Sequence, residues 1–488
     1  MKHIYILLTV LTAALLFGAC LDEEKFDTQA GDRLAFSKDT LRLDTVISGQ
    51  STPTAFFMVY NRNDHGVSIA DVSFEGGRSE GFRVNVDGMY VNDGLSQSID
   101  CPKKDSLRVF VELTPAVNDS DDPVELEAKL LFTLSNGVQQ QVVLSAWSQD
   151  VIVLRGLHIA DNTTLAAKRP YLVYDSLIVD EGTTLTLAAG TLFYFHSDAG
   201  LRVDGTLHVE GTLERPVVLR GDRTDLMFEN QPYDRVPNQW QGIRFTAASY
   251  GNRLNWCDVH SGHDGIVCDS SDISRLKLRI ENSIVHNMGG DCLRATDSKL
   301  FVGNSQISNA GKMCVRLIGG DAEFIHCTIA QFYPFDGLRG PALEYSNYQG
   351  EVARPLIRAH FINCIITGYS DDEIFGVQWE GHPETDFNYG FYNSLLDTPE
   401  VVDDVNIVLC QWDRNSNPVK REGNFPKFNL DALLFGFDLV EKSLAVGAAD
   451  ASITLSYYPR DRRGTVRMAD GQTDAGCYEY VPNPDSSM

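Results

Sequence analysis

One stretch decides the fold class of this chain: LIVDEGTTLTLAAGTLFYFHSDAGLRVDGTLHVEGTLERPVVL, residues 177–219. Three apolar triplets in it recur after 24, 22 and 24 residues: Leu177–Val179 at Leu201–Val203, Leu185–Leu187 at Leu207–Val209, and Phe193–Phe195 at Val217–Leu219. A coil with three short strands per turn explains this repeat, because each strand then lies about 4.8 Å above its counterpart one turn earlier. The stretch therefore predicts a parallel β-helix.

The period continues to residue 394. A small residue comes just before a hydrophobic pair or triplet at Cys257, Ser283, Ser305, Cys327, Cys364 and Ser394. The spacings are 26, 22, 22, 37 and 30 residues, so the later turns carry insertions. Such insertions are expected to form loops outside the coil, where binding usually resides.

These repeats resemble the right-handed parallel β-helix of the pectate-lyase-like superfamily, over residues 151–400. The sequence around Gly205–Leu207, Gly211–Leu213 and Trp240–Ile243 is similar to the opening turns of β-helices in bacteroidete surface lipoproteins. Asp474–Tyr480 resembles the D-x-G-A-x-E-[FWY] closing segment of the same proteins, with Cys477 in place of the usual alanine. Residues 401–488 are accordingly expected to form C-terminal turns and a cap, since an uncovered last turn would expose an unpaired sheet edge.

Residues 33–150 have a different pattern, of short alternating strands separated by polar loops. The clearest runs are Thr40–Leu43, Phe56–Tyr60, Phe82–Val86, Leu107–Val111 and Val142–Trp147. About seven such runs predict an immunoglobulin-like β-sandwich. The whole chain is thus expected to be all-β.

The N-terminus carries a short apolar run, Ile4–Phe17, behind Lys2 and His3. Its length and flanks are typical of an export signal, here residues 1–19. Leu16–Cys20 resembles a bacterial lipobox, which implies lipidation of Cys20, and Leu21–Glu24 resembles the acidic tag of surface lipoproteins. Residues 20–32 are expected to be a lipidated tether, and the protein to be anchored in the outer membrane by its lipid and exposed at the cell surface.

The net charge of the 488 residues is −26, with 41 Lys and Arg against 67 Asp and Glu. Binding to a phosphate backbone needs clustered cations, so no nucleic-acid partner is expected. The cysteines follow no CxxC or His–Cys spacing, so no metal site is predicted from them. No cofactor is predicted, and calcium stays open. Stacked Cys292 and Cys314 are the candidate disulfide, because the rise between coils suits its geometry.

Polar side chains crowd one region of the repeat: Asp258, His260, His263, Asp264, Asp269, His286, Asp291, Arg294 and Arg316. The repeat stacks His260 on His286 and Asp264 on Asp291, which predicts a groove. As an enzyme, the chain would be a polysaccharide lyase or glycoside hydrolase acting on an acidic polysaccharide, with candidate catalytic residues Asp264, Asp291, His260, His286 and Arg294. Asp258, His263 and Arg316 are candidate ligand-binding residues.

The motifs of known β-helix enzymes are not matched. Gly262–Gly265 fits only half of the polygalacturonase G-H-G element, and the R-x-P-x-x-R element of pectate lyases is missing. Polar groups at such turns usually hydrogen-bond along the stack. A noncatalytic role is therefore favoured over turnover.

Aromatic side chains gather on the insertions, at Tyr333, Tyr348 and Trp379. Flat rings there either stack on sugars or anchor the loops to the coil. The predicted function is a noncatalytic binding or adhesive scaffold facing a glycan or another surface protein. The alternatives are the enzyme above and a structural spacer in a cell-envelope complex.

Overall fold

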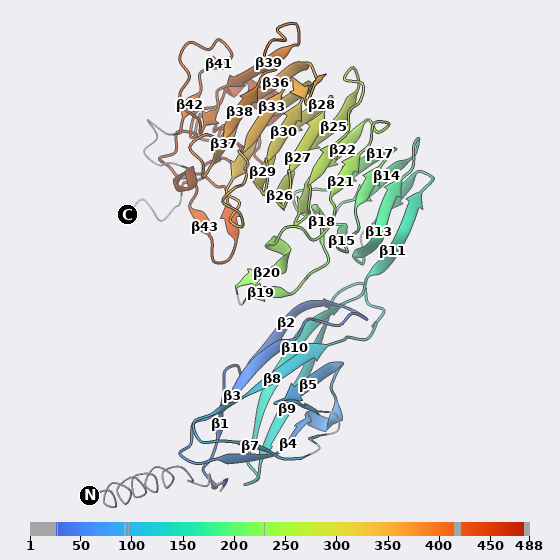
Figure 1. The fold of residues 1–488 in the computed structure, drawn as a ribbon, viewed down its shortest axis with the longest axis vertical. Coiled ribbons are helices and arrows are strands. Elements are labelled where there is room, and N and C mark those ends of the chain that lie inside the picture. Colours follow the sequence, from blue (N-terminus) through green and yellow to red (C-terminus); the bar gives the residue numbers. More distant parts are fainter. Residues whose placement is uncertain are drawn as a thin grey trace, which may run out of the picture. The chain divides into compact units, whose positions relative to one another are not determined.

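The computed structural model describes residues 26, 28–91, 94–95, 97–166, 168–228, 230–413 and 421–482. They belong to two compact units, Met1–Asp150 and Val151–Met488 (Figure 1). The predicted signal peptide and Cys20 lie outside the described residues. Among the residues that are described, no helix has the length and apolar character needed to cross a membrane.

The first unit is a sandwich of two five-stranded sheets. One sheet has the order β1 (Leu34–Phe36), β3 (Ala55–Asn61), β8 (Ser106–Leu113), β5 (Phe82–Val86), β6 (Met89–Val91). The other has the order β2 (Thr40–Ile47), β10 (Gln139–Gln149), β9 (Val124–Leu134), β4 (Val67–Phe74), β7 (Ile99–Cys101). A 3-10 turn, η1, covers Glu75–Gly77.

Alternation along each strand builds the core of this sandwich. In β8, Leu107, Val109 and Val111 are buried while Arg108 and Phe110 face outward. The predicted sandwich is confirmed, with ten strands instead of about seven. Three of these strands have only three residues, which is too short for an alternating pattern to be recognised in the sequence.

The second unit is the predicted parallel β-helix, and each regular turn contributes one strand to each of three parallel ladders. An 18-stranded sheet holds ladders 1 and 2, and a ten-stranded sheet is ladder 3. Ladder 1 comprises β15 (Leu192–Phe195), β18 (Val217–Gly221), β23 (Cys257–His260), β26 (Ile284–Met288), β29 (Gln306–Ala310), β32 (Thr328–Gln331), β37 (Ile365–Gly368), β40 (Leu395–Leu396) and β42 (Gln411–Trp412). Ladder 2 comprises β16 (Leu201–Val203), β21 (Ile243–Phe245), β24 (Ile266–Cys268), β27 (Leu293–Thr296), β30 (Val315–Ile318), β33 (Leu343–Ser346) and β38 (Ile374–Val377).

Longer strands open the same sheet, at β11 (Ile152–Ile159) and β13 (Tyr171–Val179). Ladder 3 comprises β12 (Thr163–Leu165), β14 (Thr184–Ala188), β17 (Thr206–Glu210), β22 (Asn252–Asn255), β25 (Leu276–Glu281), β28 (Lys299–Gly303), β31 (Gly320–Ile325), β36 (Leu356–Ile362), β39 (Phe387–Tyr392) and β41 (Ile407–Val408). The parallel pairing reaches Trp412, so the coil extends beyond residue 400.

Two of the three predicted series have the expected register. Leu177 pairs with Leu201, and Leu185 pairs with Leu207. Phe193 pairs with Leu219, two residues beyond its predicted partner Val217. A shift of two residues leaves the same side chains facing the core, so the apolar pattern alone could not tell the two registers apart.

The column of small residues from Cys257 to Ser394 forms successive rungs of ladder 1, as predicted. It also carries hydrogen bonds between turns. Ser305 Oγ accepts from the N–H of Ser283 at 3.0 Å, and Ser283 Oγ accepts from the N–H of Cys257 at 3.0 Å. Cys364 Sγ and Ser394 Oγ accept in the same way from the N–H groups of Cys327 and Cys364. Four side chains of this column therefore satisfy a backbone donor of the turn before.

The candidate Cys292–Cys314 disulfide is not formed. Both residues are buried free thiols, and their sulfurs donate to carbonyl oxygens of ladder 1, Cys292 to Ser308 and Cys314 to Ala330. These bonds across the bore hold the two sulfurs in place without a covalent link.

Residues 421–482 pack along the flank of the coil. Their elements are η3 (Arg421–Asn424), β43 (Lys427–Asn429), β44 (Leu434–Gly436) and α2 (Ala451–Tyr457). Tyr458 Oη donates to Glu281 Oε1 at 2.7 Å, and the N–H of Gly476 donates to the carbonyl of Asn363 at 2.8 Å. The segment thus contacts turns that are far from it in sequence.

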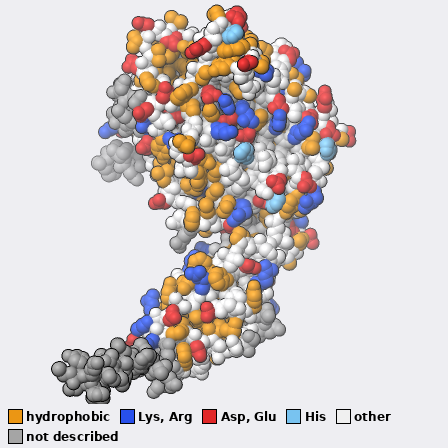
Figure 2. All heavy atoms as spheres, viewed as in Figure 1, with side chains coloured by type: hydrophobic (Ala, Val, Ile, Leu, Met, Phe, Trp, Pro, Cys, Tyr) orange, Lys and Arg blue, Asp and Glu red, His pale blue; other side chains and the backbone are white. Residues whose placement is uncertain are grey.

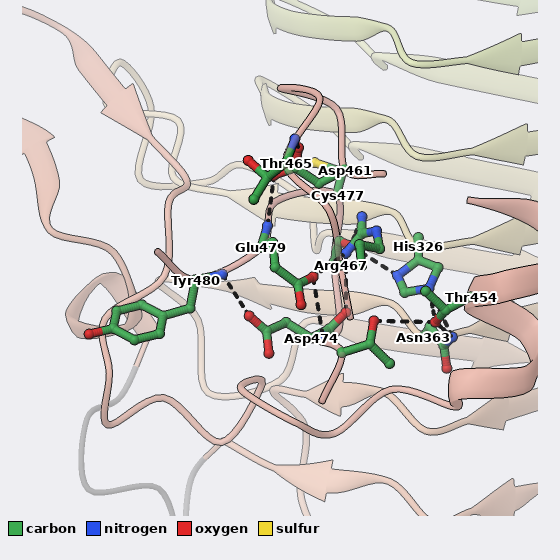
Figure 3. A network of polar contacts seen from close by, with 12 residues as sticks. His326, Asn363, Thr454, Asp461, Thr465, Arg467, Asp474, Cys477, Glu479 and Tyr480 are labelled. Atoms are coloured by element: carbon green, nitrogen blue, oxygen red, sulfur yellow. Dashed lines mark hydrogen bonds and ion pairs between the residues drawn. The ribbon is translucent and has the colours of Figure 1, made fainter. Parts of the chain in front are cut away.

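The Asp474–Tyr480 motif builds a polar network against this flank (Figure 3). Fully buried Arg467 lies at its centre and pairs with Glu479 at 3.0 Å. Gly476 has φ +91°, which favours glycine, and its carbonyl accepts from Arg467 at 3.0 Å. Asp474 accepts from the N–H of Tyr480 at 2.6 Å. These contacts hold the segment together, and the N–H of Cys477 joins it to the coil by donating to Thr328 Oγ1 at 3.1 Å.

Candidate functional site

The polar residues predicted to share one groove are separated by the structure into a histidine cluster on ladder 1 and a row of charges on ladder 2. His260 pairs in register with His286 on ladder 1, and Arg294 pairs with Arg316 on ladder 2. Asp264 and Asp291 lie at the bends between the ladders. The predicted stacking is therefore present, and each group has its own partners.

The histidine cluster consists of Asp258, His260 and His286. Asp258 Oδ1 lies 2.8 Å from Nδ1 of His260 and 3.2 Å from Nε2 of His286, and the two rings are 4.9 Å apart. Burial would raise the pKa of Asp258, but the two imidazoles hold it well below its usual range. Burial lowers the pKa of His260 against the opposing effect of Asp258. The cluster is thus a carboxylate facing two imidazoles.

Asp264 and Asp291 cap the bends of successive turns. Asp264 Oδ1 accepts from the N–H of Asp291 at 3.2 Å, and Asp291 Oδ1 accepts from the N–H of Met313 at 3.1 Å. Arg294 bridges the two carboxylates, with Nη2 3.1 Å from Asp264 and Nη1 3.2 Å from Asp291. Burial raises the pKa of Asp291, which the Met313 hydrogen bond and Arg294 partly oppose.

This arrangement does not suit glycosidic cleavage. A glycosidase needs two carboxyl groups on either side of the scissile bond. Here the same guanidinium lies between Asp264 and Asp291, and the Asp291 side chain is fully buried. The candidate catalytic residues at the bend therefore have structural partners.

The outward charges of ladder 2 are neutralised in pairs. Arg244 Nε lies 2.9 Å from Asp269, and Arg316 Nε lies 2.8 Å from Glu344. Figure 2 shows acidic and basic side chains interspersed over the visible face of this unit. In the part of ladder 2 that the structure describes, Arg244, Arg294 and Arg316 each have a carboxylate partner. These arginines therefore do not form a row of free cations that could bind an acidic polymer.

His263 and Tyr333 have separate surroundings. His263 Nδ1 lies 2.9 Å from Oδ1 of Asn238, which belongs to the insertion between β18 and β21. Tyr333 is buried, its ring packs against Phe335 at 5.4 Å, and burial raises its pKa. Tyr333 therefore anchors its loop to the coil and is unsuited to the ligand-binding role assigned from the sequence.

Tyr348 and Trp379 come together on the later insertions, with His382 as a third ring. Trp379 stacks on His382 with centroids 3.7 Å apart and on Tyr348 with centroids 5.8 Å apart. The interplanar angles are 24° and 16°. We call Tyr348, Trp379 and His382 the ring stack. It was predicted only in part, because nothing in the sequence indicated that His382 would join it.

Glu373, Asp397 and Asp413 form a buried acidic cluster near the end of the coil, which was not predicted from the sequence. Burial raises the pKa of Glu373 to about 7 and that of Asp397 to about 7, the latter with help from the nearby charge of Asp413. Glu373 accepts from the N–H groups of Ala342 and Ser370, both at 2.7 Å. Asp397 and Asp413 directly follow paired residues of ladder 1, and Glu373 directly precedes a strand of ladder 2. The sequence did not reveal this alignment, because the turns near the end of the coil differ in length.

No family model and no curated protein matches this chain. Among solved structures, the catalytic unit of a GH87 alpha-1,3-glucanase from Streptomyces thermodiastaticus aligns over 73% of this chain and 75% of its own, with 10% identity and a TM-score of 0.22. PapD-like domain 7 of human CEP192 aligns over 27% of this chain and 96% of its own, with 9% identity and a TM-score of 0.18. A family 123 glycoside hydrolase from Clostridium perfringens aligns over 24% of this chain and 25% of its own, with 10% identity and a TM-score of 0.18. At these TM-scores the likenesses carry no argument about the site.

Proposed function

We propose that this protein is a noncatalytic scaffold that binds neutral glycans through the ring stack, and that lipidated Cys20 holds it at the outer cell surface. The observation that carries the proposal is the near-parallel packing of three rings on insertions outside the coil. Aromatic faces bury a large area against a sugar at small entropic cost.

The ring stack is held rigidly by one buried amide. Asn347 Oδ1 accepts from the N–H of Trp379 at 2.7 Å, and its Nδ2 donates to the carbonyl of Thr385 at 3.0 Å. Asn347 is fully buried and precedes Tyr348, so a single side chain joins both loops that carry the rings. A site ordered in advance loses less entropy when it binds its ligand.

Charge favours a neutral glycan. Exposed Glu380 and Glu384 flank the rings, and Glu384 lies 3.0 Å from Nδ1 of His382. The chain also carries a net charge of −26. Both features repel a polymer of uronic acids. The proposal therefore differs from the alternative of an enzyme for acidic polysaccharides.

The test is binding to neutral polysaccharides on a glycan array, with the Trp379→Ala variant beside the wild type. We expect Trp379→Ala to weaken binding about tenfold or more, the loss of roughly 1.4 kcal/mol or more of contact energy. Tyr90→Ala is the matched control, because Tyr90 is a 67% exposed ring on the sandwich. Equal binding by wild type and Trp379→Ala would refute the role of the rings.

The same samples test for catalysis. The scaffold releases neither reducing nor unsaturated ends from neutral or uronate polysaccharides. Product release that disappears in the Asp264→Asn, Asp291→Asn double variant, with the melting temperature retained, would establish the enzyme instead.

The surface location is tested separately. Labelled palmitate should enter the wild type and not Cys20→Ser, and only the wild type should be shaved by protease from intact cells. Failure of this test would remove the anchor and leave the glycan site standing.

A further inference from the structure

Asp258, His260 and His286 hold their ligand atoms in one small volume. One ligand atom from each, a carboxylate oxygen and two imidazole nitrogens, all lie within 4.8 Å of one another. No metal-ligand spacing is visible in the sequence at these positions, because Asp258 and His260 share one strand and His286 comes from the next turn. Stacking of the turns creates the cluster.

From this geometry we propose that Asp258, His260 and His286 form a binding site for a divalent transition ion of the zinc type. Zinc in proteins is usually tetrahedral, with bonds to nitrogen and oxygen of about 2.0–2.2 Å. Two ligands of such an ion are about 3.3 Å apart. Asp258 Oδ1 already lies 2.8 Å and 3.2 Å from the two ring nitrogens, and all three ligand atoms lie within 4.8 Å of one another. Binding of the ion would draw the two ring nitrogens toward the tetrahedral spacing.

The ligand set selects the class of ion. Imidazole nitrogen with one carboxylate suits zinc, cobalt, nickel and copper. Calcium and magnesium prefer shells made entirely of oxygen and are therefore poor fits. Calcium is therefore not the ion expected at these three residues.

The backbone beneath the site is held by the β-helix. His260 and His286 are paired in register between β23 and β26. Trp240 Nε1 donates to the carbonyl of His260 at 2.8 Å, and the indole is fully buried. Ligands on paired strands keep their separation, which is what a metal site requires of its scaffold.

The site has an entry path and a local charge that admits a cation. The side chains of Asp258 and His286 retain 26% and 22% exposure, while that of His260 retains 9%. Arg220 is the nearby cation that acts on His260. Its guanidinium is paired with Asp234 at 3.3 Å and donates to the carbonyls of Gly221 and Arg223, so its charge is largely compensated.

Three protein ligands leave one tetrahedral position facing solvent. Structural zinc sites usually have four protein ligands, whereas sites with three take water or a ligand group in the fourth position. The site shares no residue with the ring stack, so metal binding and glycan binding can be tested separately.

The experiment uses the full chain, purified without a histidine tag, and titrates it with Zn²⁺ by calorimetry and with Co²⁺ by visible absorption. We expect one ion per chain and a Co²⁺ spectrum typical of tetrahedral coordination. His286→Asn and Asp258→Asn should each weaken binding about tenfold or more, since even the outer partners of metal ligands matter at that level. Ca²⁺ should not displace Co²⁺.

His196→Asn is the matched control. His196 Nδ1 lies 2.7 Å from Asp222, so it is a single histidine–carboxylate pair on the same unit. The His196→Asn variant should bind Zn²⁺ with the same affinity as the wild type. A rise in melting temperature with Zn²⁺ in the wild type, and not in a folded Asp258→Asn protein, gives a second readout.

Two results would overturn the proposal. One is no Zn²⁺ binding by the wild type. The other is equal binding by the wild type, His286→Asn and Asp258→Asn, which would place the ion elsewhere. If His286→Asn fails to fold, the more conservative Asp258→Asn decides.

Discussion

Replacing Arg467 with leucine should detach the C-terminal segment from the coil. Its Nη2 donates to Asn304 Oδ1 at 2.9 Å and to the carbonyl of Gly476 at 3.0 Å, and its Nη1 donates to Glu479 at 3.0 Å. Asn304 belongs to the coil, whereas Gly476 and Glu479 belong to the closing motif. One fully buried guanidinium therefore joins two distant parts of the chain.

The loss of stability in Arg467→Leu depends on the Glu479 carboxyl that remains buried. Arg467→Leu leaves the Glu479 carboxyl, whose side chain is 6% exposed, without its cation. Burial raises the pKa of Glu479 to about 8, so the comparison is made at about pH 9, where the carboxyl is ionised. Removing one partner of a buried ion pair then costs about 3–5 kcal/mol. Replacing both partners with apolar residues is often close to neutral. The Arg467→Leu, Glu479→Leu double variant should therefore recover much of the lost stability.

The assay is urea unfolding followed by circular dichroism, with hydrogen exchange of residues 461–480 as the local readout. Arg463→Leu is the control, because Arg463 is an exposed partner of Asp438 and such surface pairs contribute about 1 kcal/mol or less. The reasoning fails if Arg467→Leu unfolds within about 1 kcal/mol of the wild type. It fails equally if the double variant is less stable than Arg467→Leu.

Three further changes probe the coil itself. Because burial raises the pKa of Glu373 from 4.5 to about 7 and that of Asp397 from 3.8 to about 7, the folded state keeps protons that the unfolded chain releases. The free energy of unfolding should therefore fall as the pH rises from about 4 to about 7, by about 1.4 kcal/mol per unit of pKa difference, and Asp397→Asn should flatten urea midpoints measured across that range. Ser305→Ala removes an acceptor from a buried N–H and should cost about 1–3 kcal/mol in urea unfolding, whereas Ser305→Cys should cost less. Gly265→Ala would place a Cβ 2.3 Å from the carbonyl oxygen of Cys292, so its melting temperature should drop, and an unchanged value would contradict the close approach of these turns.

The sequence was most informative where one turn copies the next. Ser283 and Ser305 recur at the same point of successive turns, and this alone placed them on one column. His260 and His286 were stacked correctly for the same reason. The spacing of a repeat predicts which residues pair between successive turns, because the side chains at equivalent positions must fit the same space.

The sequence was least informative about partners outside the repeat. Arg467 donates a hydrogen bond to Asn304, which lies 163 residues earlier in the chain, and no sequence spacing predicts such a contact. Asp264 and Asp291 were correctly stacked, but nothing in the sequence indicated that the Arg294 guanidinium would pair with both carboxylates. Whether a carboxylate faces solvent or caps the N–H of the next turn depends on the bend of the backbone, which composition and period do not report.

The same stacking explains where chemistry can arise on this coil. Successive turns lie about 4.8 Å apart, so an outward charge usually finds an opposite charge on a neighbouring turn, as Arg316 finds Glu344. The charged side chains of such a ladder are paired with one another, so few of them are available to bind a ligand. The exceptions are places where three groups converge or where an insertion adds rings from outside the repeat. Asp258 beside two imidazoles is the first kind, and Trp379 stacked with Tyr348 and His382 is the second. Binding is therefore expected at these two departures from the ladder, and each can be lost without disturbing the other.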